Sequence, residues 1–330
     1  MGREFFQKCC NPAPPQNKLA AVPTKLQSRS PSATAFLGYG SCALAGTCWG
    51  TGFYFGKIAL TELSVGHMVF YRFAFACLGL LPLLRPARLN RKDWLLLLIA
   101  SLLGIPLQFL IQFYGLSLTT VSHAALMVGT MPVILAIGAT IFTHERLDWK
   151  GWLALAGSTT GVALITLSGS RHQHAASGPS FYGDMLIVFS LVIALGWVLL
   201  NRDLMHRHAP ITVTVYNILI GTAMLAPWVI VRNGAPPIHG LSIKVWLACA
   251  AGGLLCTSAA TFLWNWGMHH VPASRAGVFL NIEPALGSIL GVELLGDKLG
   301  PAAWLGGALI VTAAIILTTT GKVEVEIVLE

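Results

Sequence analysis

Charged side chains are scarce in this sequence. Aspartate, glutamate, lysine and arginine make up 10% of its 330 residues, whereas soluble proteins average about 25%. Hydrophobic residues make up 55%, and a soluble chain of this length would need far more polar surface. The shortage of charge therefore argues against an ordinary soluble protein and favours one that lies in a lipid bilayer.

Motifs that carry enzyme or cofactor chemistry are also missing. The sequence has no GxxxxGK[ST] segment for nucleotide phosphates and, despite seven cysteines, no CxxC pair. No nucleophile with a matching base is recognisable, so we expect no enzyme, no cofactor and no metal site. An intramembrane enzyme remains the alternative from a different class. The net charge is +8. Most of the basic residues lie at the ends of apolar segments, where they are expected to orient the chain in a membrane. We therefore expect no nucleic-acid partner.

Apolar runs of about 20 residues recur along most of the chain. Each is long enough to cross a hydrocarbon core of about 30 Å as an α-helix. The sequence thus predicts an all-α membrane protein with ten transmembrane helices. The predicted spans are 35–57, 65–84, 94–116, 121–142, 149–169, 181–200, 211–231, 243–267, 273–295 and 301–320.

The basic residues predict the orientation of these spans. With the N-terminus inside, 15 lysines and arginines fall in cytoplasmic segments and 5 outside, with Arg72 within the second span. Short cytoplasmic loops carry such an excess, so both termini are predicted inside. Residues 1–33 are predicted to form a disordered cytoplasmic tail and residues 322–330 a C-terminal tail.

The chain also repeats itself. A shift of 152 residues pairs Trp94 with Trp246 and Pro132 with Pro284, and the match holds from residue 94 to about residue 169. An odd number of helices per repeat gives two halves of opposite orientation, the plan of many secondary transporters, with a substrate site near the bilayer midplane. We predict one five-helix repeat over 34–170 and a second over 181–321.

Five segments then carry a resemblance to a known family. They are WGTGFYFGKIAL (49–60), YRF (71–73), MPVILAIGATIFTHERL (131–147), GDMLIVFSLVIALGW (183–197) and NIEPALGSILGVELLGDKL (281–299). Their order and the duplication resemble the EamA family of the drug/metabolite transporter superfamily, most of all its bacterial inner-membrane aromatic amino acid exporters. The resemblance implies a basket-like bundle of two inverted five-helix halves around a central cavity. It also implies export of amino acids and related metabolites. One departure is Asp297, where the family favours glutamate, as at Glu145.

Polar and aromatic residues within the spans are the candidate substrate contacts, because polar groups that face lipid are costly. Gln108 and Gln112 share one helix face and fit either substrate hydrogen bonding or contacts between helices. His123 and Met127 share another face, where His123 fits either a cavity wall or the membrane interface. The other candidates are Trp49, Trp264, Phe279 and Asn281. Trp197, the repeat mate of Trp49, fits a gate, a pocket wall or the interface.

Glu283 is the acid predicted to lie deepest in the membrane. It fits three roles: a proton carrier, a structural partner of a cation such as Arg72, or a substrate contact. Pro284 follows it, and Pro132 is the repeat mate of that proline. The two prolines fit either hinges for alternating access or static kinks.

Only one basic residue, Arg72, is predicted to lie deep in the membrane, and this limits the class of substrate. Phosphorylated solutes need several buried cations to offset their charge, and only Arg72 is deep. A neutral or zwitterionic small molecule remains, with aromatic and other neutral amino acids favoured and a broad drug or metabolite exporter as the alternative. We expect a multi-pass protein of the bacterial inner membrane, with an oligomeric state that the sequence leaves open, a monomer included.

Overall fold

A computed structural model describes residues 33–86, 89–142, 149–170, 180–268, 270 and 277–320. In these ranges the regular structure is helical. The elements in chain order are α1 (Ala33–Gly50), α2 (Gly52–Ala59), α3 (Val65–Leu80), η1 (Leu81–Leu83), α4 (Arg91–Leu102), η2 (Leu103–Leu107), α5 (Gln108–Leu118), α6 (Val121–Val128), α7 (Met131–Phe142), α8 (Trp149–Ser170), α9 (Phe181–Arg207), α10 (Pro210–Asn233), α11 (Ile243–Gly253), η3 (Leu254–Ala259), α12 (Ala260–Met268), η4 (Gly277–Asn281), α14 (Ile282–Leu295) and α15 (Pro301–Thr320).

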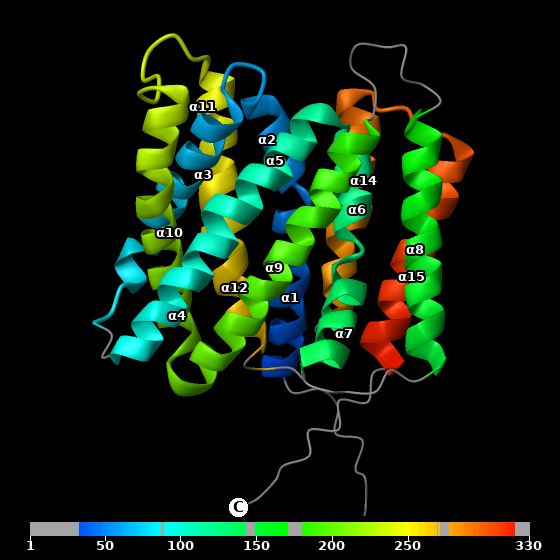
Figure 1. Cartoon of the computed structure of the whole chain (residues 1–330), viewed down its shortest axis with the longest axis horizontal. Helices are drawn as coiled ribbons and strands as arrows, with labels where there is room; N and C mark the ends of the chain where they lie inside the picture. The colour runs from blue at the N-terminus through cyan, green and yellow to red at the C-terminus, as the bar shows by residue number, and fades with distance from the viewer. Residues whose placement is uncertain are drawn as a thin grey trace, which may run out of the picture. The chain divides into compact units, whose positions relative to one another are not determined.

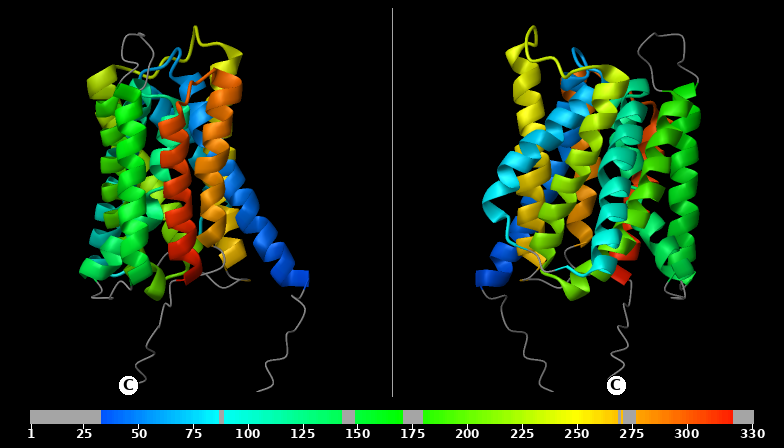
Figure 2. Two further views of the ribbon diagram at one scale, coloured as in Figure 1. Left: turned by 90° about the vertical axis from the view of Figure 1, so that its right-hand side faces the viewer. Right: turned by 60° about the vertical axis from the view of Figure 1, so that its left-hand side comes forward.

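The described helices between residues 33 and 320 run side by side as a bundle of alternating direction (Figure 1). Helix α1 begins and α15 ends at the same end of this bundle, as two further views show (Figure 2). The described parts of the ten ranges predicted from the sequence are mainly helical. The ten spans and their orientation remain predictions.

Within the described residues, five helical stretches are long and apolar enough to cross a bilayer by themselves. They are Val65–Leu83, Arg91–Leu118, Phe181–Met205, Pro210–Asn233 and Ile243–Gly267. Large apolar side chains remain exposed on outward faces, among them Leu95 at 59%, Trp152 at 60% and Leu247 at 62%. Exposed surface of this kind suits lipid rather than water, so the chain is a multi-pass helical membrane protein.

Several helices are interrupted in their middle. Helices α1 and α2 meet at Thr51, and α6 and α7 meet at the turn of Gly129 and Thr130. Segments η2 and η3 are wider turns of π-helix within otherwise continuous helices. Pro106 lies inside η2 and removes an N–H from the hydrogen-bond ladder, which accounts for that irregularity.

Both prolines of the predicted hinges lie in the first turn of a helix. Pro132 is the second residue of α7 and Pro284 the third residue of α14. The first N–H groups of a helix have no partner within it, so proline loses little there. The chain therefore restarts a helix at each proline.

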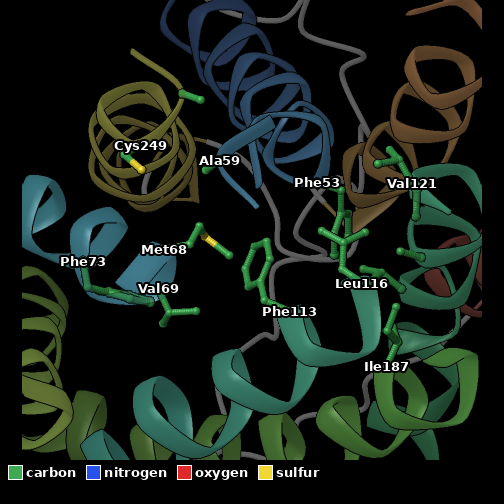
Figure 3. Close-up of a cluster of buried hydrophobic side chains, with 14 of the residues drawn as sticks. Phe53, Ala59, Met68, Val69, Phe73, Phe113, Leu116, Val121, Ile187 and Cys249 are labelled. Carbon is green, nitrogen blue, oxygen red and sulfur yellow. The ribbon is translucent and has the colours of Figure 1, made fainter. Parts of the chain in front are cut away.

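The core joins residues from both halves of the chain. Figure 3 shows Phe53, Met68, Phe113, Ile187 and Cys249 in one buried cluster. Elsewhere helices approach closely at glycine: a Cβ atom on Gly161 of α8 would lie 2.5 Å from the carbonyl oxygen of Gly306 of α15. Small residues at such crossings let transmembrane helices pack backbone against backbone.

Candidate functional site

The helix interruptions surround a cavity of about 300 Å³. This volume is at the lower end of the range of about 300–1,000 Å³ for small-molecule sites. Its polar lining consists of Arg72, Gln108, Gln112, Thr257, Thr261 and Glu283, and its aromatic lining of Trp49, Phe53, Phe73, Phe109, Phe113 and Trp197.

Irregular backbone and cavity coincide. Trp49 and Gly52 flank the break between α1 and α2, and Val128 and Met131 flank the break between α6 and α7; all four line the cavity. The same holds for residues of η3, of η4 and of the start of α14. At membrane depth, non-helical backbone is tolerated where it lines a cavity or is buried in protein, which accounts for both the interruptions and their place.

Arg72 of α3 is 7% exposed and is held by three contacts. Its Nε donates to Thr257 Oγ1 at 3.2 Å. Its guanidinium carbon lies 5.4 Å from the ring centroid of Phe109 and 5.3 Å from that of Phe113. The two rings are stacked on each other, with centroids 6.1 Å apart. Cation–π contacts with two faces fix the guanidinium group, yet they leave its two terminal nitrogens without an acceptor among the described residues.

Glu283 of α14 lies at the same cavity but does not pair with Arg72. No N···O distance within 4.0 Å joins the two side chains. The carboxylate of Glu283 also has no hydrogen-bond partner among the described residues. A charged group at membrane depth needs a partner or water, and the cavity is where Glu283 can meet either.

Gln108 and Gln112 stand at the start and on the second turn of α5, directly after the π-helical segment η2. Both line the cavity, and no hydrogen bond joins either amide to another described side chain. Buried amides in folded proteins normally have partners. The two glutamines therefore present free donors and acceptors to whatever occupies the cavity.

Two tryptophans complete the lining. The ring centroid of Trp49 lies 5.4 Å from that of Trp264, which does not itself line the cavity. Trp197 of α9 packs over Gly104, where a Cβ atom would lie 2.5 Å from the indole nitrogen. The indole N–H of Trp197 is buried without a hydrogen-bond partner in the described structure.

The remaining described candidates from the sequence are not among the residues that line the cavity. His123 and Met127 are buried in α6, at 2% and 0% exposure. Phe279 contacts the ring of Tyr39 at 6.1 Å, and Asn281 is buried directly before α14. Pro284 is buried in the first turn of α14, while the side chain of Pro132 and the whole of Arg275 and Glu145 are outside the described residues.

His123 belongs to a separate polar cluster, the Asp184 cluster. Its members are Lys57, Thr119, Ser122, His123, Asp184 and Asp297. They join the ends of α2, α5 and α14 to the starts of α6 and α9, at the end of the bundle opposite to the start of α1 (Figure 1). Asp184 lies in one of the five segments that carry the family resemblance, residues 183–197, but no sequence pattern connects it with His123.

Every side chain of the Asp184 cluster is paired. Asp184 accepts from Thr119 Oγ1 at 2.5 Å and from His123 Nδ1 at 2.9 Å. Asp297 accepts from the amide and the hydroxyl of Ser122, both at 2.9 Å. Lys57 Nζ donates to the carbonyl oxygen of Thr119 at 2.7 Å and to that of Leu116 at 2.9 Å. The cluster thus ties five helix ends together.

Fold and site define a helical membrane protein with one polar and aromatic cavity among its described residues. The chain belongs to the EamA-like transporter family, which matches residues 36–167 and 181–319. It is a transporter-family protein and not an enzyme.

Individual relatives agree with this family. An uncharacterized transporter of Archaeoglobus fulgidus is 26% identical, over 85% of this chain and 96% of the relative. The uncharacterized transporter YetK of Bacillus subtilis is 24% identical, over 83% and 84% of the two chains. A probable terminal-alkyne amino-acid exporter of Streptantibioticus cattleyicolor is 20% identical, over 82% of this chain and 89% of the relative.

The fold has also been seen in a crystal structure. That protein superposes with a TM-score of 0.59 at 19% identity, over 88% of this chain and 98% of its own. The similarity shows a shared fold.

Proposed function

We propose that this protein is a secondary transporter that exports aromatic and other neutral amino acids, and related metabolites, through the cavity described above. One observation carries the proposal: Arg72, Glu283, Gln108 and Gln112 line one cavity with donors or acceptors that have no partner among the described residues, and the buried indole N–H of Trp197, a further lining residue, has none there either. Polar groups beside aromatic rings suit a solute with a charged head and an apolar side chain. The amino-acid exporter among the relatives supports the same substrate class.

We propose ten spans in two inverted repeats, residues 34–170 and 181–321, with both termini inside. The positions of the helix interruptions support this arrangement. The π-helical segments at Leu103–Leu107 and Leu254–Ala259 overlap under the shift of 152 residues, and the restarts at Met131 and Ile282 then agree to within about one residue. A chance similarity between apolar segments would not place helix interruptions at corresponding positions in the two halves of the chain.

Alternating access is the proposed mode of transport, in the inner membrane of a bacterium. The restarts at Pro132 and Pro284 divide α6–α7 and η4–α14 beside the cavity, where a change of angle would alter access to it. The Asp184 cluster would close one end of the bundle in the present state. Hinge motion at a few such positions is the usual basis of these transitions.

The proposal is tested by flux. The purified chain is reconstituted in liposomes, and uptake of labelled tryptophan, phenylalanine and threonine is followed with and without a pH gradient. Saturable uptake above that of empty liposomes is expected, and Trp49→Ala should reduce it. Trp304→Ala is the matched control, because Trp304 is 51% exposed on α15 and does not line the cavity.

A broad drug or metabolite exporter is the second candidate, favoured by the aromatic share of the lining. Folded protein that takes up none of the three amino acids, but does take up uncharged aromatic solutes, would establish it instead.

A further inference from the structure

Two oppositely charged side chains line the same cavity without direct contact. Arg72 stands on α3 and Glu283 on α14, and no direct ion pair joins them. Within a membrane protein, charges at this depth usually pair with each other or serve a ligand. A cation and an anion that line one cavity without forming an ion pair are explained if a bound solute supplies a partner for each.

The break in the first helix lies between the two charges. A Cβ atom on Gly52 would lie 3.6 Å from both terminal nitrogens of Arg72, and one on Gly50 would lie 3.3 Å from Cα of Glu283. Thr51, between these glycines, uses its hydroxyl on the carbonyl of Cys48 at 2.7 Å and on the sulfur of Cys256 at 3.2 Å. The break therefore separates the charges, and its own hydroxyl is already engaged.

The orientation of Arg72 is set before any ligand arrives. Its Nε is used on Thr257, and its planar face lies against Phe109 and Phe113. What remains is the edge with the two terminal nitrogens, which is the geometry that binds a carboxylate through two parallel hydrogen bonds. A fixed guanidinium edge loses little entropy when it binds such a group.

We propose that Arg72 binds the carboxylate and Glu283 the ammonium group of an α-amino acid, so that the cavity selects zwitterions over amines and over acids. This inference rests on the proposed function and specifies its substrate class. Each charge then has its partner only when the substrate is bound, and a solute that carries one charge leaves the other uncompensated. The cavity then discriminates because its own buried charged group stays unpaired with the wrong solute.

The test is competition against counterflow of labelled L-tryptophan in liposomes that contain the full chain. The competitors are L-tryptophan, its decarboxylated amine and its deaminated acid. For the wild type we expect both analogues to compete at least about tenfold more weakly, which corresponds to about 1.4 kcal/mol. With Arg72→Gln, tryptophan should lose its advantage over the amine; with Glu283→Gln, it should lose its advantage over the acid.

Two glycines give a milder test that does not remove a charge. Gly52→Ala adds a methyl group 3.6 Å from the terminal nitrogens of Arg72, and Gly252→Ala adds one 3.7 Å from Cγ of the same side chain. Both contacts are ordinary van der Waals distances, so both variants should fold. Gly52→Ala should weaken competition by tryptophan and by the acid but not by the amine, whereas Gly252→Ala should resemble the wild type.

Several results would overturn the inference. Equal weakening of all three competitors by Arg72→Gln and by Gly52→Ala would give Arg72 a structural role. Unchanged selectivity in Glu283→Gln, together with loss of the response to a pH gradient, would make Glu283 a proton carrier. Absence of tryptophan, phenylalanine and threonine counterflow in folded wild type would instead refute the proposed function itself.

Discussion

The cavity and the Asp184 cluster hold similar residue types but satisfy them differently. At the cluster, Asp184 is 1% exposed and accepts from two side chains, and His123 is 2% exposed and bound to it. At the cavity, Glu283 and Gln112 have no partner in the described part of the chain. Both regions combine a carboxylate with polar neighbours, yet only one is complete without a ligand.

The difference separates a structural role from a binding role. Buried polar groups in native proteins are nearly always hydrogen-bonded, and exceptions need an explanation. The Asp184 cluster needs none, because its bonds tie helix ends together. The cavity groups are explained if a solute completes them. Stability should therefore depend on the cluster and transport on the cavity, and each prediction below tests that division.

The largest effect is expected from breaking the cluster at its centre. Asp184→Asn removes the charge that His123 and Thr119 bind, and a buried charged hydrogen-bond network loses about 3 kcal/mol or more when one member is changed. The melting temperature in detergent should fall clearly. Asp203→Asn is the matched control: Asp203 is 64% exposed and pairs with Arg207 on the same helix, a kind of pair worth about 0–1 kcal/mol.

Equal melting temperatures for these two variants would mean that the paired cluster does not stabilise the bundle. The structural role assigned to the Asp184 cluster would then be wrong.

A steric change beside the cluster should be nearly as damaging. A Cβ atom on Gly115 of α5 would lie 2.8 Å from the carbonyl oxygen of Gly183 and 3.2 Å from the amide nitrogen of Ile187 on α9. Backbone cannot move aside as a side chain can, so Gly115→Ala should cost about 1–3 kcal/mol of stability. In Gly196→Ala the nearest atom is the end of the Leu103 side chain at 3.4 Å, and a melting temperature close to that of the wild type is expected.

The sequence predicts the helices better than the contacts between them. Scarce charge and apolar runs indicate a helical membrane protein because bilayer thickness fixes how long such runs must be. Glu283 stands out as an acid in an apolar segment. By contrast, the bond between His123 and Asp184 joins residues 61 positions apart, and no periodicity encodes it. Trp197 was tied to Trp49 by the repeat, but its place at the cavity follows from its packing on Gly104.

The cavity side of the comparison is tested by comparing two buried amides. Gln112 lines the cavity without a partner, whereas Asn217 donates to Asn201 Oδ1 at 2.6 Å and to the Val213 carbonyl at 3.0 Å. Gln112→Leu should weaken substrate affinity by up to about tenfold, the value of one hydrogen bond, without lowering the melting temperature. Asn217→Leu should lower the melting temperature, because it strands the partner oxygen of Asn201. The reverse pattern would contradict the division between the two regions.

The smallest effect is expected at a loop contact that should affect neither substrate binding at the cavity nor closure of the bundle end by the Asp184 cluster. Glu62 follows α2, and its Oε2 accepts from the amide of Ser242 at 2.7 Å. Hydrogen bonding by the side chain and by the backbone amide of Ser242 lowers the pKa of the Glu62 carboxyl. A lowered folded-state pKa means that ionised Glu62 stabilises the fold above its ordinary pKa, near 4.3. That stabilisation is lost as the pH falls through the folded-state value. Glu62 is fully exposed to solvent, so the contribution is screened and small.

The melting temperatures of wild type and Glu62→Gln should differ slightly at pH 7 and converge as the pH falls below 4, while counterflow stays unchanged. A large drop in transport would show that this loop takes part in closing the bundle, and the division would have to extend beyond the Asp184 cluster.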